Sequence, residues 1–353
     1  MVEKSEKSAL FLKIKYWSGT VGKISFVTGG TGFIGQYLVR RLIDEGHSVR
    51  VLARSAEKAK ALFKDTVEII AGDISKGEAL RRGVDGADFL FHLAARVGDY
   101  GPKKEFHDVN VNGTRALLNA WEEAGGNKRG RFLYMSTNAV TGMKRTAVTD
   151  ESAPYSNTGG IYGITKGLAE KMILDRCAEN DLNGVVVRPS LVYGPGSTNW
   201  VLRPLTRIKA GKMIYIDGGR GHCWHLYVDN LIDAVILAAE SDKAKGEIFI
   251  ITDGNNDTTW REYFTRLAQC AGFPAEAKNL PKFVAMTAGQ AMYWLHNLFG
   301  ITPVLTPMNV GILTSGAGVS IEKAKTILGY KPKVDLDEGM RRVGAWLKEE
   351  GLV

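Results

Sequence analysis

The sequence has few cysteines and gives no sign of a metal centre. Cys177, Cys223 and Cys270 are the only cysteines among 353 residues, and no two of them have the spacing of a paired motif. A disulfide framework and a zinc site are therefore not predicted, and three widely separated thiols are typical of a reducing compartment. We expect a cytoplasmic protein with no bound metal.

Clustered positive charge is also missing, although the formal net charge is +8. Lysine and arginine are scattered, and no basic run alternates with aromatic residues as a groove for nucleic acid requires. We therefore predict no nucleic-acid partner. The excess positive charge is attributed instead to an anionic cofactor or a membrane surface.

No hydrophobic run is long enough to span a membrane. The most apolar stretch covers residues 282–304, and Gln290, His296 and Asn297 interrupt it. Two interpretations stay open for it: ordinary core packing, which we favour, or an amphipathic helix that covers a hydrophobic pocket or rests on a membrane. Residues 1–22 lack the apolar length and cleavage site of a secretory signal, so they are predicted to form an N-terminal extension.

Three glycines spaced three apart mark the stretch around which the chain is organised. Residues 24–27 predict a short buried strand, and residues 37–44 continue with helical periodicity. Gly29, Gly32 and Gly35 therefore fall at a strand-to-helix turn. The first turn of a helix offers unpaired N–H groups and the positive end of the helix dipole, which suit a diphosphate. The predicted contacts with a dinucleotide are Gly29, Thr31, Gly32, Phe33 and Ile34.

Further strands alternate with helical stretches after this turn. Apolar runs predict strands over residues 48–53, 67–74, 87–95 and 132–135. This alternation is typical of an α/β fold of the Rossmann type, with a doubly wound parallel sheet and helices on both faces. We expect a dinucleotide-binding domain over residues 23–195. A smaller C-terminal substrate-binding domain is expected to take most of residues 196–353, with a segment of about 222–252 returning to the sheet.

Two basic residues follow the second predicted strand. In this architecture a carboxylate at that position binds the ribose 2′-hydroxyl of NAD, and basic residues accept the 2′-phosphate of NADP. Arg54 directly follows the strand, and Lys58 comes shortly after it. We therefore predict NADP as the preferred cofactor, with NAD as the alternative if both charges are merely solvated.

A tyrosine and a lysine lie four residues apart in a helix-compatible stretch. Tyr162 and Lys166 would share one helix face. A phenol has a reference pKa near 10, and a neighbouring ammonium stabilises the phenolate and lowers that pKa. Beside a nicotinamide ring, Tyr162 would then exchange a proton with a substrate oxygen. The pair is informative because it follows a glycine turn and a strand end that carries hydroxyl side chains.

The sequence resembles the extended short-chain dehydrogenase/reductase family, within the NAD-dependent epimerase/dehydratase superfamily. The matching motifs cover most of the chain from residue 24 onward. They are residues 28–35, Asp73-Ile74, His92-Leu93-Ala94-Ala95, Asn110-Val111-Asn112-Gly113-Thr114, Met135-Ser136-Thr137, Tyr162 with Lys166, and residues 188–196.

The resemblance implies a role for each matching residue. Thr137 would bind the substrate oxygen with Ser136 beside it, and Tyr162 would be the acid/base. Lys166 would lower the pKa of Tyr162 and bind the nicotinamide ribose, and Asn110 would join the proton relay. The implied cofactor contacts are Asp73, Ile74, Leu93, Ala94, Ala95, Pro189, Ser190, Tyr162 and Lys166, and the implied substrate contacts are Ser136, Thr137, Tyr162 and Val192. The family also implies a homodimer.

The substrate is less well specified than the reaction. Sugar-nucleotide members of the family carry an arginine that binds the diphosphate, and Cys223 takes its place here. A thiol cannot form a cationic fork to phosphate. The remaining motifs look more like the branch of 3β-hydroxysteroid dehydrogenases and dihydroflavonol reductases. We expect NAD(P)-dependent interconversion of a secondary alcohol and a ketone on a hydrophobic, steroid-like or 3-oxoacyl-like substrate. A sugar-nucleotide epimerase or dehydratase with tightly bound NAD is the alternative.

Overall fold

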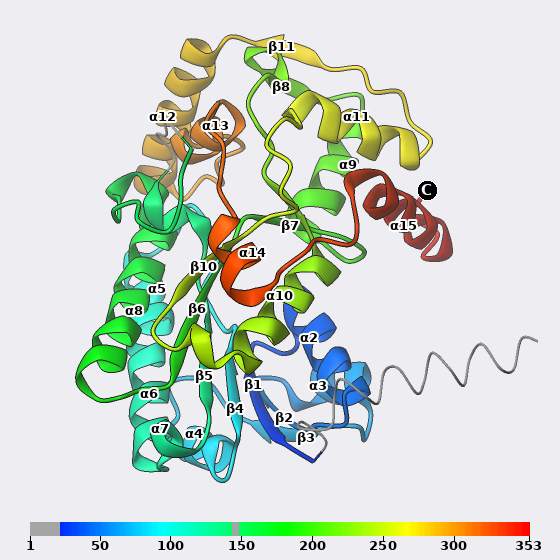
Figure 1. The fold of residues 1–353 in the computed structure, drawn as a ribbon. Coiled ribbons are helices and arrows are strands. Elements are labelled where there is room, and N and C mark those ends of the chain that lie inside the picture. The colour runs from blue at the N-terminus through cyan, green and yellow to red at the C-terminus, as the bar shows by residue number, and fades with distance from the viewer. Residues whose placement is uncertain (1–21, 143–147) are drawn as a thin grey trace, which may run out of the picture.

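A computed structural model of the protein describes residues 22–142 and 148–353. The predicted N-terminal extension, residues 1–22, lies almost wholly outside this described part. The described chain forms a large parallel sheet covered by helices on both faces, with a smaller group of elements above one edge (Figure 1).

The central sheet has seven strands, and all of their pairings are parallel. Their order is β10-β6-β5-β4-β1-β2-β3, in which the chain moves outward from β1 in one direction and then in the other. This order confirms the predicted Rossmann-type sheet. The strands are β1 (Ile24–Thr28), β2 (Ser48–Ala53), β3 (Glu68–Ala71), β4 (Phe89–His92), β5 (Arg131–Met135), β6 (Gly184–Pro189) and β10 (Ile248–Ile251).

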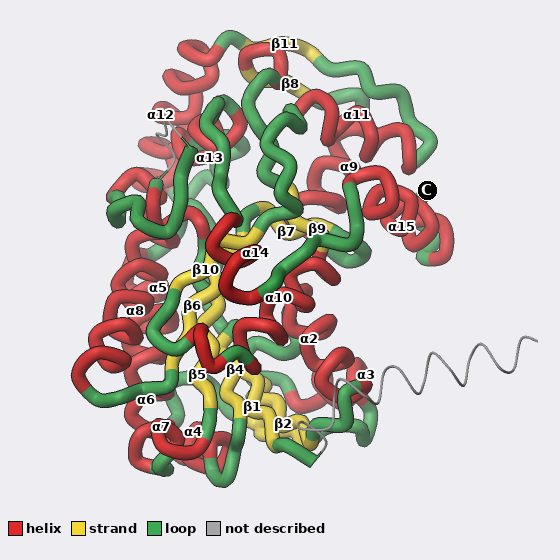
Figure 2. The backbone as a smooth tube through the Cα atoms, in the orientation of Figure 1, coloured by secondary structure: helices red, strands yellow, loops and turns green. Residues whose placement is uncertain are grey.

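Helices cover the two faces of the sheet in separate layers (Figure 2). The helices α2 (Phe33–Asp44), α3 (Ala56–Phe63) and α10 (Val228–Glu240) lie on one face. The helices α4 (Gly77–Val84), α6 (Thr114–Glu123) and α8 (Gly160–Glu179) lie on the other. Each layer has its own apolar core, because strands buried on both faces present aliphatic and aromatic side chains to each side. The short helices α5 (Lys103–Phe106) and α7 (Gly126–Arg129) flank α6.

The C-terminal half of the chain builds the elements above the carboxyl edge of the sheet. Two small parallel sheets pair β7 (Leu191–Tyr193) with β9 (His225–Tyr227), and β8 (Ile214–Ile216) with β11 (Lys278–Leu280). The surrounding helices are α9 (Arg203–Lys209), α11 (Trp260–Cys270), α12 (Lys282–Phe299), α13 (Pro307–Leu313), α14 (Glu322–Leu328) and α15 (Leu336–Glu349). The chain thus returns to the central sheet through β10 before it completes this upper group.

Helix α12 differs from the other long helices in its packing. Only Ala285 and Gly289 are buried within it, and Gly289 lies directly against the backbone of Thr306 and Pro307. Most of its large apolar side chains face outward; Phe283 is 73% exposed. The favoured expectation of ordinary core packing is therefore wrong for the outer face of this helix. None of the helices in the described part is both long enough and apolar enough to cross a membrane.

Candidate active site

The glycine turn between β1 and α2 is shaped by backbone contacts that a side chain would block. Gly29 has φ +76°, and a Cβ atom there would lie 2.6 Å from the amide nitrogen of Ala94. A Cβ atom on Gly35 would lie 2.2 Å from the carbonyl oxygen of Gly29. Helix α2 begins after Gly32, and no side chain caps its first N–H groups. The turn therefore forms a close backbone cradle with free donors, which fits the diphosphate of a dinucleotide.

The segment after β4 lines the same cradle. The amide of Leu93 donates to the carbonyl of Thr28 at 3.0 Å, and the amide of Ala94 donates to the Thr28 hydroxyl at 3.3 Å. Ala95 follows in the same loop after β4. The predicted cofactor contacts from two distant parts of the sequence are thereby brought together at the carboxyl edge of the sheet.

The ends of β2 and β3 carry the predicted contacts for the adenosine half of the cofactor. Arg54 and Lys58 are both exposed beside the end of β2, and the amide of Lys58 is bound by the cap residue of α3. Asp73 accepts hydrogen bonds from the amide and hydroxyl of Ser75, which order the loop after β3. Ile74 is buried and packs against Gly113. The four residues thus lie at the ends of two neighbouring strands, and Arg54 is accessible to an anionic group.

Thr137 and Tyr162 meet where β5 ends and α8 begins. Thr137 follows β5 and caps the short helix Asn138–Thr141 by accepting from the amide of Ala139 at 3.2 Å. Tyr162 lies half-buried in the first turn of α8. Burial raises the pKa of Tyr162 to about 12, and hydrogen bonding by the Thr137 hydroxyl opposes that rise. The phenol is therefore protonated at neutral pH and shares its surroundings with a second hydroxyl.

Lys166 is buried one helical turn after Tyr162. Its Nζ atom donates to the carbonyl of Met135 at 2.6 Å and lies 4.0 Å from the centre of the Tyr134 ring. Burial lowers the pKa of Lys166 to about 7, although the charge of Glu170 raises it. The expected lowering of the Tyr162 pKa by Lys166 is not present in this structure, because burial dominates and Lys166 is held against the end of β5.

Asn110 occupies a π-helical segment, His107–Gly113, that runs into α6. Its side-chain oxygen accepts from the amide of Arg96 at 2.7 Å, and its side-chain nitrogen donates to the Thr165 hydroxyl at 3.0 Å. Thr165 precedes Lys166, so Asn110 fixes the helix that carries the tyrosine and the lysine. A π-helical turn at such a position is frequent at functional sites.

His92 extends this network, and the sequence patterns gave it no role of its own. Its Nδ1 and Nε2 atoms lie 2.8 Å from the hydroxyls of Thr28 and Thr114, respectively. Thr114 donates its single hydroxyl proton to the carbonyl of Asn110, so it accepts from an Nε2–H group. Burial and the nearby Lys166 keep the pKa of His92 well below its ordinary value, so the ring is neutral. A buried chain of hydrogen bonds thus connects the glycine turn with Asn110.

Ser136 does not share the environment of Thr137. It is buried, and its hydroxyl donates to Glu170. Glu170 also accepts from the hydroxyl of Tyr155 at 2.9 Å and from the Nε and Nη2 atoms of Arg188. Successive residues of an extended strand end point in opposite directions, so only one of the two neighbouring hydroxyls reaches Tyr162. The expectation that Ser136 contacts substrate does not fit this geometry.

Glu170 and Arg188 form a buried ion pair that sequence reasoning missed. Both side chains are at most 2% exposed. The signal was present, since Glu170 lies four residues after Lys166 and therefore on the same helix face. Its partner on β6 could not be read from the sequence, because the pairing depends on how α8 packs against the sheet.

The segment after β6 carries the remaining predicted contacts. Pro189 ends β6 opposite Ile251 of β10. Ser190 follows with a buried hydroxyl that has no hydrogen-bond partner in the described structure. An orphaned hydroxyl at the carboxyl edge fits a polar group of a bound cofactor. Val192, the predicted substrate contact, is largely buried in β7, so it can offer only a small apolar surface.

The chain matches the NAD dependent epimerase/dehydratase family over residues 25–252. It belongs to this family. It is 31% identical over 320 residues to a 4-hydroxy-2-methyl-3-oxo-4-farnesyl-3,4-dihydroquinoline-1-oxide ketoreductase of Stigmatella aurantiaca. That alignment covers 90% of this chain and 94% of the relative. It is 31% identical over 329 residues to a 3-beta-hydroxysteroid dehydrogenase of Mycolicibacterium neoaurum, which covers 89% of this chain and 88% of that protein.

A solved structure gives the same fold. The UDP-glucose 4-epimerase of Thermotoga maritima superposes with a TM-score of 0.76 at 24% identity, which covers 93% of this chain and 99% of that one. The family and its curated relatives make this protein an NAD(P)-dependent oxidoreductase that acts on a CH–OH group, which confirms the predicted enzyme class and the nicotinamide dinucleotide cofactor.

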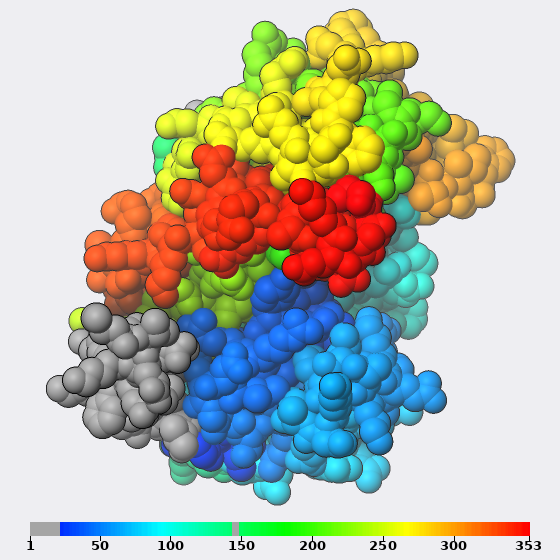
Figure 3. Space-filling model, turned by 90° about the vertical axis from the view of Figure 1, so that its right-hand side faces the viewer, coloured from blue at the N-terminus to red at the C-terminus, as the bar shows by residue number. Residues whose placement is uncertain are grey.

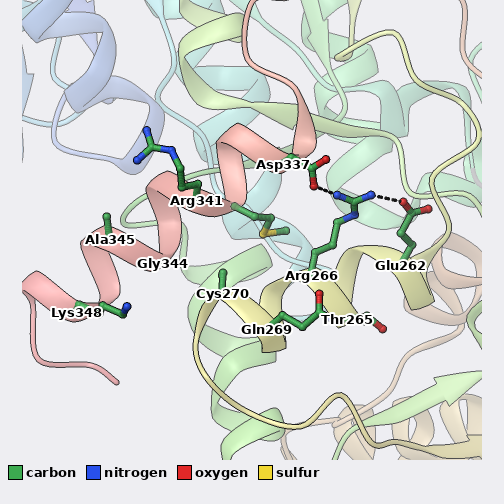
Figure 4. A pocket seen from close by; sticks show the side chains of 11 residues that line it. Glu262, Thr265, Arg266, Gln269, Cys270, Asp337, Arg341, Gly344, Ala345 and Lys348 are labelled. Carbon is green, nitrogen blue, oxygen red and sulfur yellow. Dashed lines mark hydrogen bonds and ion pairs between the residues drawn. The ribbon is translucent and has the colours of Figure 1, made fainter.

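A separate groove between α11 and α15 has no part in this site. It has a volume of about 840 Å³, and its lining includes charged side chains from both helices, among them Glu262, Arg266 and Lys348 (Figure 4). Arg266 crosses it to form ion pairs with Glu262 and Asp337, so the charges of these three side chains are paired with one another. Among the described residues no group of histidine, cysteine or acidic side chains could hold a metal ion.

Proposed function

We propose that the protein transfers a hydride between NADP(H) and the oxygen-bearing carbon of a bulky hydrophobic ketone or secondary alcohol, with Tyr162 as the acid/base. The observation that carries this proposal is the meeting of the Tyr162 phenol with the Thr137 hydroxyl after β5, at the same carboxyl edge of the sheet as the glycine turn after β1. When bound, the nicotinamide supplies or accepts the hydride.

Tyr162 and Thr137 have different roles at the substrate oxygen. The Thr137 hydroxyl orients the oxygen by a hydrogen bond, and Tyr162 exchanges the proton. Because the pKa of Tyr162 is raised to about 12, the phenol carries its proton at neutral pH. It can therefore donate that proton to an alkoxide that develops as a ketone is reduced. Lys166 would bind the nicotinamide ribose after turning from the Met135 carbonyl.

Arg54 supports NADP as the preferred cofactor. It directly follows β2, where a carboxylate would favour NAD, and it is exposed. A guanidinium offers paired donors to the three oxygens of a 2′-phosphate, and Lys58 lies near enough along α3 to add charge. A measurement of affinity for both dinucleotides tests this preference.

A hydrophobic substrate is supported by the relatives and by the loss of a phosphate-binding arginine. Of the curated relatives described above, one is named for a farnesyl-bearing oxo-dihydroquinoline and the other for a 3-beta-hydroxysteroid. Cys223 stands where sugar-nucleotide enzymes of the family carry arginine, and its thiol is buried. Arg220, the nearest replacement in sequence, is exposed and paired with Asp217 at 3.0 Å.

The second candidate function is that of a sugar-nucleotide epimerase with tightly bound NAD. It is retained as an alternative because a solved epimerase has the same fold. The two functions differ in net redox change. We expect the purified protein to consume NADPH in the presence of ketosteroids, 2-alkyl-3-oxoacids or flavonoid ketones. An epimerase would instead retain its cofactor through turnover and show no net oxidation.

The acid/base assignment is tested with Tyr162→Phe on the substrate found in that screen. Loss of a general acid lowers kcat by about 10²–10⁴-fold, while NADP binding should stay within the range of the parent protein. Tyr215→Phe, a buried tyrosine in β8, is the matched control and should keep its activity. Full turnover by Tyr162→Phe would refute the assignment.

A further inference from the structure

Helix α12 and the segment after it expose the densest group of apolar side chains in the described part of the chain. Seven of the thirteen large hydrophobic residues that are exposed there fall between residues 283 and 304. Six of them are more than half exposed and define what we call the α12 patch: Phe283, Trp294, Leu298, Phe299, Ile301 and Val304. Five of the six fall within residues 294–304, and large apolar groups of this kind on a protein surface often mark an interaction site.

The patch faces away from the rest of the protein. In the space-filling view the gold and orange segment that contains α12 projects from the body of the molecule (Figure 3). Trp294 and Leu298 lie one turn apart near the end of α12, and both are more than 60% exposed, so their side chains face solvent rather than cover an internal pocket. The inner face already packs on α13 through Ala285 and Gly289.

The ionisable side chains closest to the patch in the sequence are basic, although the carboxylate of Asp99 accepts hydrogen bonds from Thr306 and Asn309 behind α12. From residue 277 to residue 321 the sequence has no aspartate or glutamate, and this interval has two exposed lysines, Lys278 in β11 and Lys282 at the start of α12. Arg207 of α9 is also exposed and lies against the carbonyl of Val304. Apolar side chains bordered by lysine and arginine, with a tryptophan among them, are typical of a helix that lies in the interface of an anionic bilayer.

We propose that the α12 patch docks the protein on the surface of an anionic lipid bilayer, with α12 lying along the interface rather than crossing it. The lysines meet lipid headgroups, and Trp294, Leu298 and Phe299 enter the boundary of the acyl chains. The net charge of +8 adds a longer-range attraction to the same surface.

Docking would place the membrane on the side of the protein where α12 and α13 meet the segment after β4 and the start of α8. His296 of α12 packs against the ring of Tyr100, in the segment after β4, at 5.0 Å. Met308 of α13 lies against Gly160, which begins the helix that carries Tyr162. If the proposed function holds, a lipid-dissolved ketone would reach Tyr162 without passing through water. This consequence rests on the proposed function, whereas the docking does not.

The experiment is flotation of the full-length protein with vesicles of phosphatidylcholine alone or of phosphatidylcholine mixed with phosphatidylglycerol. We expect binding to the mixed vesicles that weakens as salt is added. The variant Trp294→Glu/Leu298→Glu should bind about a hundredfold or more weakly, because two apolar side chains no longer enter the lipid. Both residues are exposed, so the fold should be unaffected; circular dichroism and size exclusion check this.

The matched control is Leu168→Glu/Val353→Glu, which makes the same chemical change at two exposed apolar residues outside the patch. It should float like the parent protein. The proposal is overturned if the parent protein stays unbound in both lipid mixtures, or if the patch variant floats as well as the control. A third result would show that a second copy of the chain covers the patch: the parent protein is a dimer, the patch variant is a monomer, and neither binds lipid. Because flotation does not depend on turnover, its failure is distinct from failure of the proposed reaction.

Discussion

Removal of the Glu170 charge should destabilise the protein far more than removal of a comparable surface carboxylate. Glu170 is fully buried and accepts hydrogen bonds from Arg188, Tyr155 and Ser136. Glu170→Gln keeps the shape of the side chain but leaves the Arg188 guanidinium buried and charged without a counterion. Breaking a buried pair in this way costs about 3–5 kcal/mol. Since a folded domain is stable by only about 5–15 kcal/mol, the loss should be large.

Asp175→Asn provides the control on the same helix. Asp175 pairs with Lys171 across one turn of α8, and both side chains are about half exposed. Such a surface pair is worth about 0–1 kcal/mol. Urea unfolding followed by circular dichroism should therefore show a clear drop in midpoint for Glu170→Gln and almost none for Asp175→Asn.

A double variant separates the unpaired charge from the loss of hydrogen bonds. Glu170→Gln/Arg188→Met removes both charges, and we expect it to regain most of the lost stability. The reasoning would be refuted if Glu170→Gln and Asp175→Asn unfolded at the same urea concentration, or if the double variant were no more stable than Glu170→Gln. The charge of Glu170 also raises the pKa of Lys166, so Glu170→Gln should move the alkaline limb of activity to lower pH.

Three further outcomes follow from the site. Folding lowers the pKa of Lys166 from 10.5 to about 7, so between these pH values the unfolded chain holds a proton that the folded chain lacks. The free energy of unfolding of the parent protein, relative to that of Lys166→Met, should therefore rise by about 1.4 kcal/mol per pH unit across this window. Urea unfolding at a series of pH values measures this slope. Gly35→Ala would press its methyl group against the Gly29 carbonyl and should abolish dinucleotide binding, whereas retention of binding in calorimetry would contradict the cradle. Arg54→Asp should weaken NADP binding about tenfold or more while sparing NAD, and an unchanged ratio of the two affinities would show that Arg54 is only a solvated charge.

The sheet and its glycine turn could be predicted because their signals are local. Short apolar runs between helical stretches located five of the strands, and the predicted run 48–53 coincides with β2. The predicted run 87–95 was longer than β4, Phe89–His92, because the chain leaves the sheet after His92: Leu93 still donates to the Thr28 carbonyl, and Ala94 donates to the Thr28 side chain instead. Sequence pattern therefore found the elements, and hydrogen bonding between strands set their ends.

The candidate site was predicted in outline but not in its electrostatics. The spacing of Tyr162 and Lys166 correctly put both on α8. It could not show that Lys166 is held by the Met135 carbonyl, or that burial raises the pKa of Tyr162. Both effects depend on how deeply α8 sits against β5, and no feature of the helix alone encodes that depth.

The sequence by itself determined the order of the helices and strands and the side chains available at their ends. These features could be predicted because hydrophobic periodicity, glycine turns and the spacing of residues along a helix each depend on only a few neighbouring residues. Only the tertiary structure decided which of two adjacent hydroxyls, Ser136 or Thr137, meets Tyr162, which arginine neutralises Glu170, and which face of α12 stays uncovered. Each of these outcomes depends on surfaces contributed by distant parts of the chain, so none could be fixed until those parts packed together.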